Sequence, residues 1–254
     1  MTAWLDGRFV AVATLPKPDA VAPFETMAAR AGELPLWPRH LDRLAVTAAR
    51  LGLPTGPTLA WRGAAVDLLL RNGHGDGVLR LLLAPVAGRV HVVMTTRPRS
   101  PLSALTCLPT VLERPTSAPP ADLKAEPRGF YSAVLQQAQD GGADEGLVVA
   151  PDGAVLEFAN GNLCLRRDGR WCTPPLDGRV LPGLGRALLL EAAAAAGMVF
   201  RELPCGLGDL HGAEALAHVN AVYGPRPISL LGAAPAVAIV DNELGRLWRR
   251  ATNG

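Results

Sequence analysis

The chain has 254 residues, 49% of them hydrophobic, and a formal net charge of only +2 at neutral pH. This length suits one large domain or two smaller ones with an ample core, and the scattered Lys and Arg residues leave no nucleic-acid footprint. No apolar stretch is long enough to span a membrane, and the N-terminus has no apolar run of signal-peptide length. The four cysteines form no Cys-x-x-Cys motif, so we expect free thiols and a cytoplasmic protein.

The N-terminal half of the chain is predicted to combine strands with two helices. Apolar side chains recur at helical spacing from Leu41 to Leu51, which predicts a helix over 40–51 that Gly52 and Pro54 end. Residues 1–12 are expected to form a strand and turn, with the turn at Asp6-Gly7. The other predicted elements are a strand or turn over 24–29, a helix over 59–70, hairpin strands over 78–83 and 90–96, and a strand over 105–112.

A proline-rich segment at 114–120 is the best candidate for a domain boundary, because it contains Pro115, Pro119 and Pro120. We therefore divide the chain into a small N-terminal α+β domain over 1–114, a linker over 115–120 and a large C-terminal domain over 121–254. Beyond the linker we expect a helix over 128–139, strands over 146–150, 154–158, 163–166, 171–173, 198–203, 215–221 and 228–231, and helices over 183–196 and 241–250.

Lysine is rare in this sequence, and that rarity draws attention to Lys124. The chain has 25 Lys plus Arg residues, and only Lys17 and Lys124 are lysines. Arginine does not release its proton in proteins, whereas a lysine in a low-dielectric site can become the neutral amine that forms Schiff bases. Taken alone, Lys124 also fits an ordinary surface lysine in an arginine-rich chain.

Several short motifs surround Lys124 in a defined order along the chain. They are Phe24-Glu25-Thr26-Met27, His40-Leu41-Asp42-Arg43-Leu44, the strand–turn–strand from Gly146 to Glu157, Asn160-Gly161-Asn162, and Pro182-Gly183-Leu184-Gly185-Arg186. This order resembles the fold-type IV pyridoxal phosphate (PLP) family, which includes branched-chain and D-amino-acid aminotransferases and aminodeoxychorismate lyase. The resemblance covers roughly residues 20 to 230 and implies the two-domain α+β fold of the D-amino-acid aminotransferase-like PLP enzymes.

The resemblance also implies roles for two residues toward the cofactor. A PLP enzyme needs a lysine for the Schiff base, an acid that faces the pyridine nitrogen, a phosphate cup and a base. Lys124 matches the lysine, and its amine can also serve as the base. Glu157, followed by Asn162, matches the acid, since a carboxylate there keeps the ring nitrogen protonated. Considered alone, Glu157 also fits a glutamate at the end of a strand.

The implied phosphate cup combines one side chain with backbone amides at a helix start. Its residues are Arg43, Leu184, Gly185, Asn220 and Ala221. Relatives usually carry Gly-x-Thr-Arg at this turn, whereas this chain has Gly185 in place of the threonine. The change removes a hydroxyl hydrogen bond worth about 1 kcal/mol net. Arg43 alone also fits a solvent-facing arginine.

Two residues favour a lyase among the reactions of this family. Thr26 stands where branched-chain aminotransferases usually carry glycine, and its hydroxyl could pass a proton to a departing enolpyruvyl group. Arg128, a candidate substrate ligand, matches the Lys-x-x-Asn-Arg pattern of lyases, although Pro127 replaces the asparagine. We therefore expect a 4-amino-4-deoxychorismate lyase that forms p-aminobenzoate for folate synthesis. The alternatives are a class IV aminotransferase acting on branched-chain or D-amino acids, and a PLP-fold protein that has lost turnover.

The resemblance further implies a small-molecule substrate and a homodimer. No metal site is expected, because His91, His211 and His218 lack metal-binding spacing, and His40 is interpreted as structural.

Overall fold

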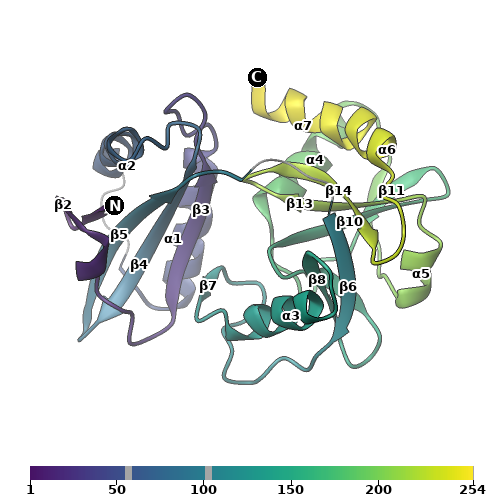
Figure 1. Cartoon of the computed structure of the whole chain (residues 1–254), viewed down its shortest axis with the longest axis horizontal. Helices are drawn as coiled ribbons and strands as arrows, with labels where there is room; N and C mark the ends of the chain where they lie inside the picture. The colour runs from purple at the N-terminus through teal and green to yellow at the C-terminus, as the bar shows by residue number, and fades with distance from the viewer. Residues whose placement is uncertain (55–58, 101–104, 254) are drawn as a thin grey trace. The chain divides into compact units, whose positions relative to one another are not determined.

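The computed structural model describes residues 1–54, 59–100 and 105–253. The chain packs as two compact units (Figure 1). Unit 1 comprises 1–101 together with 123–127, and unit 2 comprises 102–122 together with 128–254. The expected α+β class is confirmed, since both units combine helices with sheets.

Unit 1 is built on a sheet with strand order β2–β1–β5–β4–β3–β7, in which neighbouring strands are antiparallel. Helix α1 packs against β3, and helix α2 packs against β1 and β5. The elements of unit 1 are β1 Thr2–Leu5, β2 Arg8–Ala11, the 3-10 helix Val12–Thr14, β3 Ala22–Ala28, α1 Trp37–Arg50, α2 Leu59–Arg71, β4 Val78–Val86, β5 Arg89–Arg97 and β7 Ala125–Glu126.

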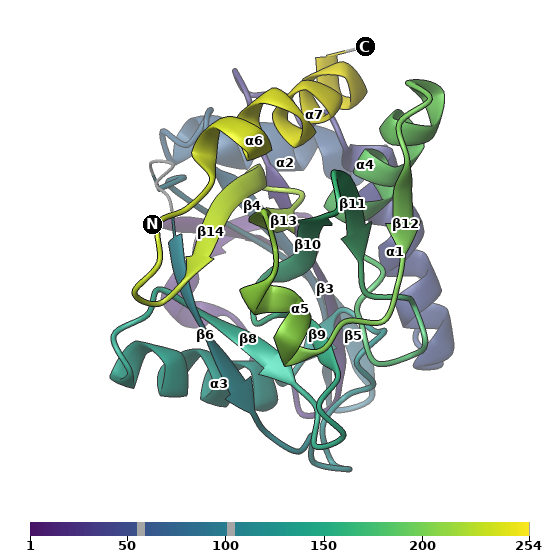
Figure 2. The same cartoon turned by 90° about the vertical axis from the view of Figure 1, so that its right-hand side faces the viewer.

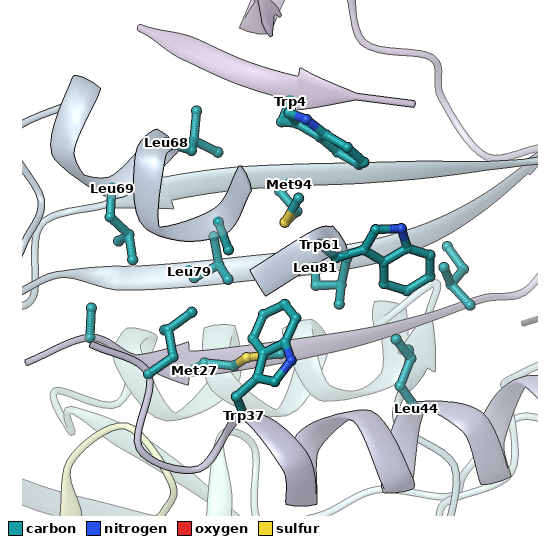
Figure 3. Close-up of a cluster of buried hydrophobic side chains, with 14 of the residues drawn as sticks. Trp4, Met27, Trp37, Leu44, Trp61, Leu68, Leu69, Leu79, Leu81 and Met94 are labelled. Carbon is teal, nitrogen blue, oxygen red and sulfur yellow. The ribbon is translucent and has the colours of Figure 1, made fainter. Parts of the chain in front are cut away.

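The core of unit 1 lies between one face of this sheet and the two helices (Figure 3). The sheet supplies alternate residues, including Met27 of β3, Leu81 of β4 and Met94 of β5. The helices supply Trp37 and Trp61, so large aromatic side chains fill the space between the layers. Because strand side chains alternate between faces, Phe24, Thr26 and Arg80 lie on the opposite face of the sheet.

Three two-residue hairpin loops use the same backbone geometry. Asp6-Gly7, Ala87-Gly88 and Asp168-Gly169 all have positive φ at both positions, from +45° to +95°. Such turns match the right-handed twist of the flanking strands, and glycine at the second position accepts positive φ without strain. The turn predicted at Asp6-Gly7 is therefore confirmed.

Unit 2 contains a closed sheet with strand order β12–β11–β10–β13–β14–β6–β8–β9, in which β9 also pairs with β10 (Figure 2). The pairs β6–β8, β6–β14 and β11–β12 are parallel, and the others are antiparallel. The strands of unit 2 are β6 Leu105–Val111, β8 Glu145–Val149, β9 Val155–Phe158, β10 Gly161–Arg167, β11 Arg170–Thr173, β12 Phe200–Glu202, β13 Ala215–Asn220 and β14 Gly224–Leu230. Leu147, Phe158, Leu163 and Ile228 contribute to a core cluster formed by side chains from these strands.

Helices pack on the outside of this closed sheet. Helix α3 lies against β8 and β6, and α7 lies against α4 and β14. The helices of unit 2 are α3 Gly129–Asp140, α4 Leu184–Ala195, α5 Leu207–His211, α6 Val237–Asn242 and α7 Leu244–Asn253.

The single terminal helix predicted over 241–250 is wrong, because the structure has two helices there, α6 and α7. The break falls at Glu243, whose carboxylate accepts hydrogen bonds from Arg166 Nε at 3.1 Å and Trp171 Nε1 at 2.6 Å. These partners lie on β10 and β11, so a long-range contact accompanies the interruption.

The packing units differ from the predicted division at 115–120. Strand β6 pairs with β8 and β14 of unit 2, although the prediction placed it in the first domain. Residues 123–127 pack with unit 1, because β7 pairs with β3 through Ala125 opposite Pro23 and Glu126 opposite Ala22.

Candidate active site

Lys124 directly precedes β7 and belongs to unit 1. Its carbonyl oxygen accepts a 3.0 Å hydrogen bond from the amide of Phe24, which extends the pairing between β7 and β3. The Lys124 side chain is half-buried, and its Nζ lies 4.6 Å from the centroid of the Phe24 ring. The face of an aromatic ring attracts a cation, so Phe24 helps to fix the position of this amine.

Thr26 lies two residues after Phe24 on the same face of β3 and is half-buried. Its partner across the sheet is Arg80 of β4, whose guanidinium carbon lies 3.8 Å from the Phe24 ring centroid. Arg80 also donates a 2.6 Å hydrogen bond to Glu126 of β7. The predicted catalytic residues Lys124 and Thr26 are thus both neighbours of Phe24.

A buried ion pair lies beneath β3, on the side that faces α1. The carboxylate of Glu25 is fully buried and accepts two hydrogen bonds from Arg43, from Nε and from Nη2, each 2.7 Å long. Burial alone raises the pKa of Glu25, but Arg43 and His40 outweigh it and lower that pKa to about 2. Arg43, predicted as a phosphate ligand, is therefore held by a carboxylate that the sequence interpretation did not include, and it is only 12% exposed.

His40 completes this cluster through its Nδ1, which lies 2.6 Å from Glu25 Oε2. The ring is 1% exposed, and its Nε2 is buried with no hydrogen-bond partner among the described residues. Burial lowers the pKa of His40, Glu25 raises it, and the positive charges of Arg43 and Lys124 lower it. A neutral His40 that donates from Nδ1 to Glu25 fits these contacts and the structural role expected for it.

Glu157 belongs to unit 2, lies near the end of β9 and is 3% exposed. Its Oε1 accepts a 2.6 Å hydrogen bond from the hydroxyl of Tyr131, and its Oε2 accepts a 3.1 Å bond from the Leu181 amide. Asn162 Nδ2 lies 3.3 Å from the same Oε2 and donates at 2.9 Å to the Leu181 carbonyl. Both carboxylate oxygens are therefore fixed. Glu157 and Asn162, which the sequence predicts to act in one site, are in contact.

Helix α4 starts directly after this group, and glycines shape its first turn. A Cβ added to Gly183, the N-cap residue, would lie 1.8 Å from Asn162 Oδ1. A Cβ at Gly185 would lie 2.9 Å from the backbone carbon of Asn220. Only glycine lets the chain approach its neighbours this closely at either position. The first amides of a helix lack intrahelical acceptors, so this turn is suited to binding an anion.

The turn after β13 contains the other two predicted phosphate residues, Asn220 and Ala221. Asn220 Oδ1 accepts hydrogen bonds from the amides of Val222 and Tyr223, at 3.1 and 2.9 Å. Its Nδ2 donates at 3.1 Å to the carbonyl of Asn160, so this side chain joins the two turns.

Arg128 binds the same β9–β10 turn from the start of α3. Its guanidinium donates to the carbonyl of Ala159 and, at 3.2 Å, to Asn160 Oδ1. These contacts give Arg128 a partner within the protein, in addition to the substrate role that the motif implies.

The predicted site residues thus fall into two groups. Unit 1 holds Lys124 and Thr26 as neighbours of Phe24, with Arg43 on the α1 side of β3, and unit 2 brings together Glu157, Asn162, Leu184, Gly185, Asn220 and Ala221, with Arg128 beside them. Sequence interpretation missed Glu25 and Tyr131, which directly contact predicted residues. Glu25 lies within the motif Phe24-Glu25-Thr26-Met27, whereas Tyr131 carries no signal beyond its place in the first turn of α3.

The remaining nucleophile candidates are unsuited to catalysis. All four cysteines are free and buried, and burial raises the pKa of Cys107, Cys164 and Cys205 to about 12. Across residues 1–54, 59–100 and 105–253, no group of three or more His, Cys, Asp or Glu side chains is placed to hold a metal ion. Within the same ranges, no helix has the length and apolar character needed to cross a membrane.

Comparison with known proteins identifies the family. The profile of the amino-transferase class IV family matches residues 22–231, so the chain belongs to that family. Comparison with curated proteins finds no match.

Solved structures share the fold at low sequence identity. A candidate 4-amino-4-deoxychorismate lyase from Legionella pneumophila is 22% identical over 91% of each chain, with a TM-score of 0.81. A hypothetical aminotransferase from Mycobacterium tuberculosis, in its α-ketoglutarate- and PMP-bound form, is 20% identical over 99% of each chain, with a TM-score of 0.85. A branched-chain aminotransferase from Thermoproteus uzoniensis, with norvaline, is 22% identical over 100% of this chain and 95% of its own, with a TM-score of 0.85. The predicted two-domain fold of this enzyme class is therefore confirmed.

Proposed function

We propose that this chain is a PLP-dependent 4-amino-4-deoxychorismate lyase, which expels pyruvate and leaves p-aminobenzoate for folate synthesis. The observation that carries the cofactor assignment is Glu157, a buried carboxylate held by Tyr131 and the Leu181 amide at the approach to a glycine-shaped helix start. PLP would supply an electron sink for the carbanion formed when a substrate loses a proton. A Mycobacterium tuberculosis aminotransferase of the same fold has been solved in a PLP-bound form.

Each group of residues would have a defined task toward the cofactor. Lys124 would bind it covalently and, once released by substrate, would accept and return protons through Nζ. Glu157 would face the pyridine nitrogen and keep its proton in place by charge. The first-turn amides of α4 at Leu184 and Gly185, together with the 220–221 turn, would hold the phosphate. Arg43 would add positive charge to that site, with Glu25 fixing its orientation.

The lyase assignment rests on Thr26. Its position beside Phe24, whose ring lies 4.6 Å from Lys124 Nζ, supports a hydroxyl that delivers a proton to the leaving enolpyruvyl carbon. A positioned acid–base group contributes up to about 10²-fold in rate. We therefore expect Thr26→Val to lower p-aminobenzoate formation strongly while PLP binding is retained. Equal losses of lyase activity and of PLP binding would instead indicate that Thr26 only stabilises the strand.

The decisive experiment assays both products of the purified, PLP-loaded protein. With aminodeoxychorismate as substrate, we expect p-aminobenzoate and pyruvate in equal amounts. Borohydride reduction and peptide mapping should then locate the pyridoxyl group on Lys124, with Lys17 as the internal control. A label on Lys17, or none on a PLP-loaded protein, would contradict the proposed site.

The second candidate is a class IV aminotransferase acting on branched-chain or D-amino acids. The binding of the Arg128 guanidinium to the Ala159 carbonyl and Asn160 favours it, because one of the two residues that point to a lyase has a role inside the protein. Amino transfer to a keto acid without any p-aminobenzoate would establish this alternative.

We also propose that the protein works as a homodimer in the cytoplasm. The dimer rests on the family resemblance, and the four free cysteines fit a reducing compartment. Light scattering on the PLP-loaded protein tests the dimer, and a fully active monomer would refute it.

A further inference from the structure

Tyr131 connects α3 to the carboxylate of Glu157. Its hydroxyl donates to Glu157 Oε1 over 2.6 Å, a short distance typical of charge-assisted hydrogen bonds. The other carboxylate oxygen, Oε2, accepts from the Leu181 amide and Asn162. Tyr131 therefore binds Oε1, while the Leu181 amide and Asn162 bind Oε2.

The Tyr131 hydroxyl acts as a constant proton donor. Burial and the neighbouring Glu157 carboxylate raise the pKa of Tyr131, and Arg114 lowers it by a smaller amount. The phenol consequently keeps its proton across the range in which the enzyme works. A protonated phenol beside a carboxylate oxygen can only donate to it, so the direction of this hydrogen bond is fixed.

The Tyr131 ring is itself held by its surroundings. The guanidinium carbons of Arg114 and Arg128 lie 5.1 and 5.0 Å from its centroid, and the Phe130 ring packs edge-on at 5.3 Å. Arg114 donates to the carbonyl of Pro119, and Arg128 donates to the carbonyl of Ala159. Two anchored arginines thus restrict the ring and keep the hydroxyl directed at Glu157.

A hydrogen bond donated to a carboxylate stabilises its ionised form and weakens its affinity for a proton. We propose that Tyr131 is a positioning residue that holds Glu157 ionised and keeps a shared proton on the ring nitrogen of the cofactor rather than on the carboxylate. This inference rests on the proposed PLP function. Without the hydroxyl, Glu157 would take a larger share of that proton, and the ring would withdraw electrons less strongly.

The test replaces Tyr131 by phenylalanine and observes the ring nitrogen directly. Protein loaded with PLP that carries ¹⁵N in the pyridine ring reports protonation of that nitrogen through its NMR shift. We expect the signal of Tyr131→Phe to move from the wild-type position toward that of Glu157→Gln, in which the carboxylate is absent. Turnover should fall about tenfold, the size expected for one hydrogen bond to a charged group. A merely structural role would leave the ¹⁵N shift unchanged.

The chain offers a matched control, because Tyr223 is its only other tyrosine. Tyr223→Phe removes the same hydroxyl elsewhere in unit 2 and should leave the ¹⁵N shift at the wild-type value. A shift of equal size in both variants would overturn the assignment to Tyr131.

A second variant keeps the test valid if Tyr131→Phe does not fold. Cells that produce the Tyr223→Phe variant in medium containing 3-fluorotyrosine incorporate the label only at Tyr131. Fluorine makes the phenol a stronger hydrogen-bond donor and changes little else. The ¹⁵N signal should then move in the opposite direction, toward a more fully protonated ring.

The outcomes separate the two proposals. Wild-type protein that binds no PLP would contradict the proposed function and this inference together. Wild-type binding with an unchanged ¹⁵N signal in both Tyr131 variants would overturn only the role of Tyr131.

Discussion

Two buried glutamates, one in each unit, are held in contrasting ways. Glu25 of unit 1 is bound by the guanidinium of Arg43 through two hydrogen bonds and by His40 through a third. Glu157 of unit 2 is bound by a phenol, a backbone amide and a side-chain amide, all of them neutral donors. The first carboxylate is bonded to a cation of the protein, whereas these three donors to the second carry no charge.

This contrast distinguishes a structural carboxylate from one suited to a ligand. A buried charge is costly unless it is paired, so Glu25 and Arg43 stabilise each other and fix β3 to α1. Neutral donors orient Glu157 and favour its ionised form, which is the form that the proposed role toward a ring nitrogen requires. The two residues should therefore respond differently to the same kind of substitution.

The largest expected effect is on stability, from Glu25→Ala. Removing one partner of a buried ion pair typically costs roughly 3–5 kcal/mol, because the other charge stays buried. Urea unfolding of the purified protein measures this loss. The matched control is Glu33→Ala, which breaks the exposed Arg62–Glu33 pair of the same unit and should change the unfolding midpoint very little. Similar midpoints for the two variants would show that the Glu25 pair does not stabilise unit 1.

Glu157→Gln tests the second buried carboxylate of this comparison, that of unit 2. The amide keeps the shape but cannot hold a ring proton by charge, so turnover should fall on the order of a hundredfold, about 2.7 kcal/mol of barrier. Because the donors from Tyr131, Asn162 and Leu181 are neutral and the amide keeps the side-chain shape, we expect the unfolding midpoint to change much less than for Glu25→Ala. Unchanged turnover would remove Glu157 from the site.

A smaller effect is expected from Gly185→Thr, which restores the residue that relatives usually carry. The side chain would meet the Asn220 backbone, where even a Cβ lies 2.9 Å from the carbonyl carbon. Overpacking of this kind costs roughly 1–3 kcal/mol, so we expect weaker PLP binding and lower stability despite the added hydroxyl. Tighter PLP binding, measured by fluorescence titration, would show that the turn adjusts.

The mildest effect is the dependence of stability on pH. His40 has a lowered pKa when folded, so the unfolded chain takes up a proton first and stability falls as the pH drops below about 6.5. Glu25 adds a second loss between its ordinary value of 4.5 and its folded value of about 2. Urea midpoints from pH 7 to pH 3 should decline, and Glu25→Gln should flatten the lower part of the curve. A midpoint that rises on acidification would reverse the assigned sign.

Local signals in the sequence were enough to predict much of the fold. The hairpin turns depend on adjacent residues such as Asp168-Gly169, and α1 depends on apolar spacing that ends at Gly52. Contacts between distant residues were not predictable. The two-residue strand β7 exists through its pairing with β3, and the break between α6 and α7 involves Arg166 and Trp171.

The candidate site shows the same limit. Motif order predicts Lys124, Glu157 and the α4 start as site residues, because the resemblance carries those positions directly. It could not show that Arg43 binds Glu25 or that Tyr131 binds Glu157, since both pairs form across separate elements. The lack of room at Gly185 also became visible only with the Asn220 backbone beside it.

The placement of residues 123–127 affects how the gene can be divided. These residues pack with unit 1, although the chain on either side of them belongs to unit 2. A fragment ending at residue 114 would lack β7, and the complementary fragment would carry Lys124 away from Phe24. Neither fragment alone therefore contains both Lys124 and its neighbour Phe24. Exchange of either half by recombination would therefore pair Lys124 with a β3 strand from a different parent, so the two halves must remain compatible at the β3–β7 pairing.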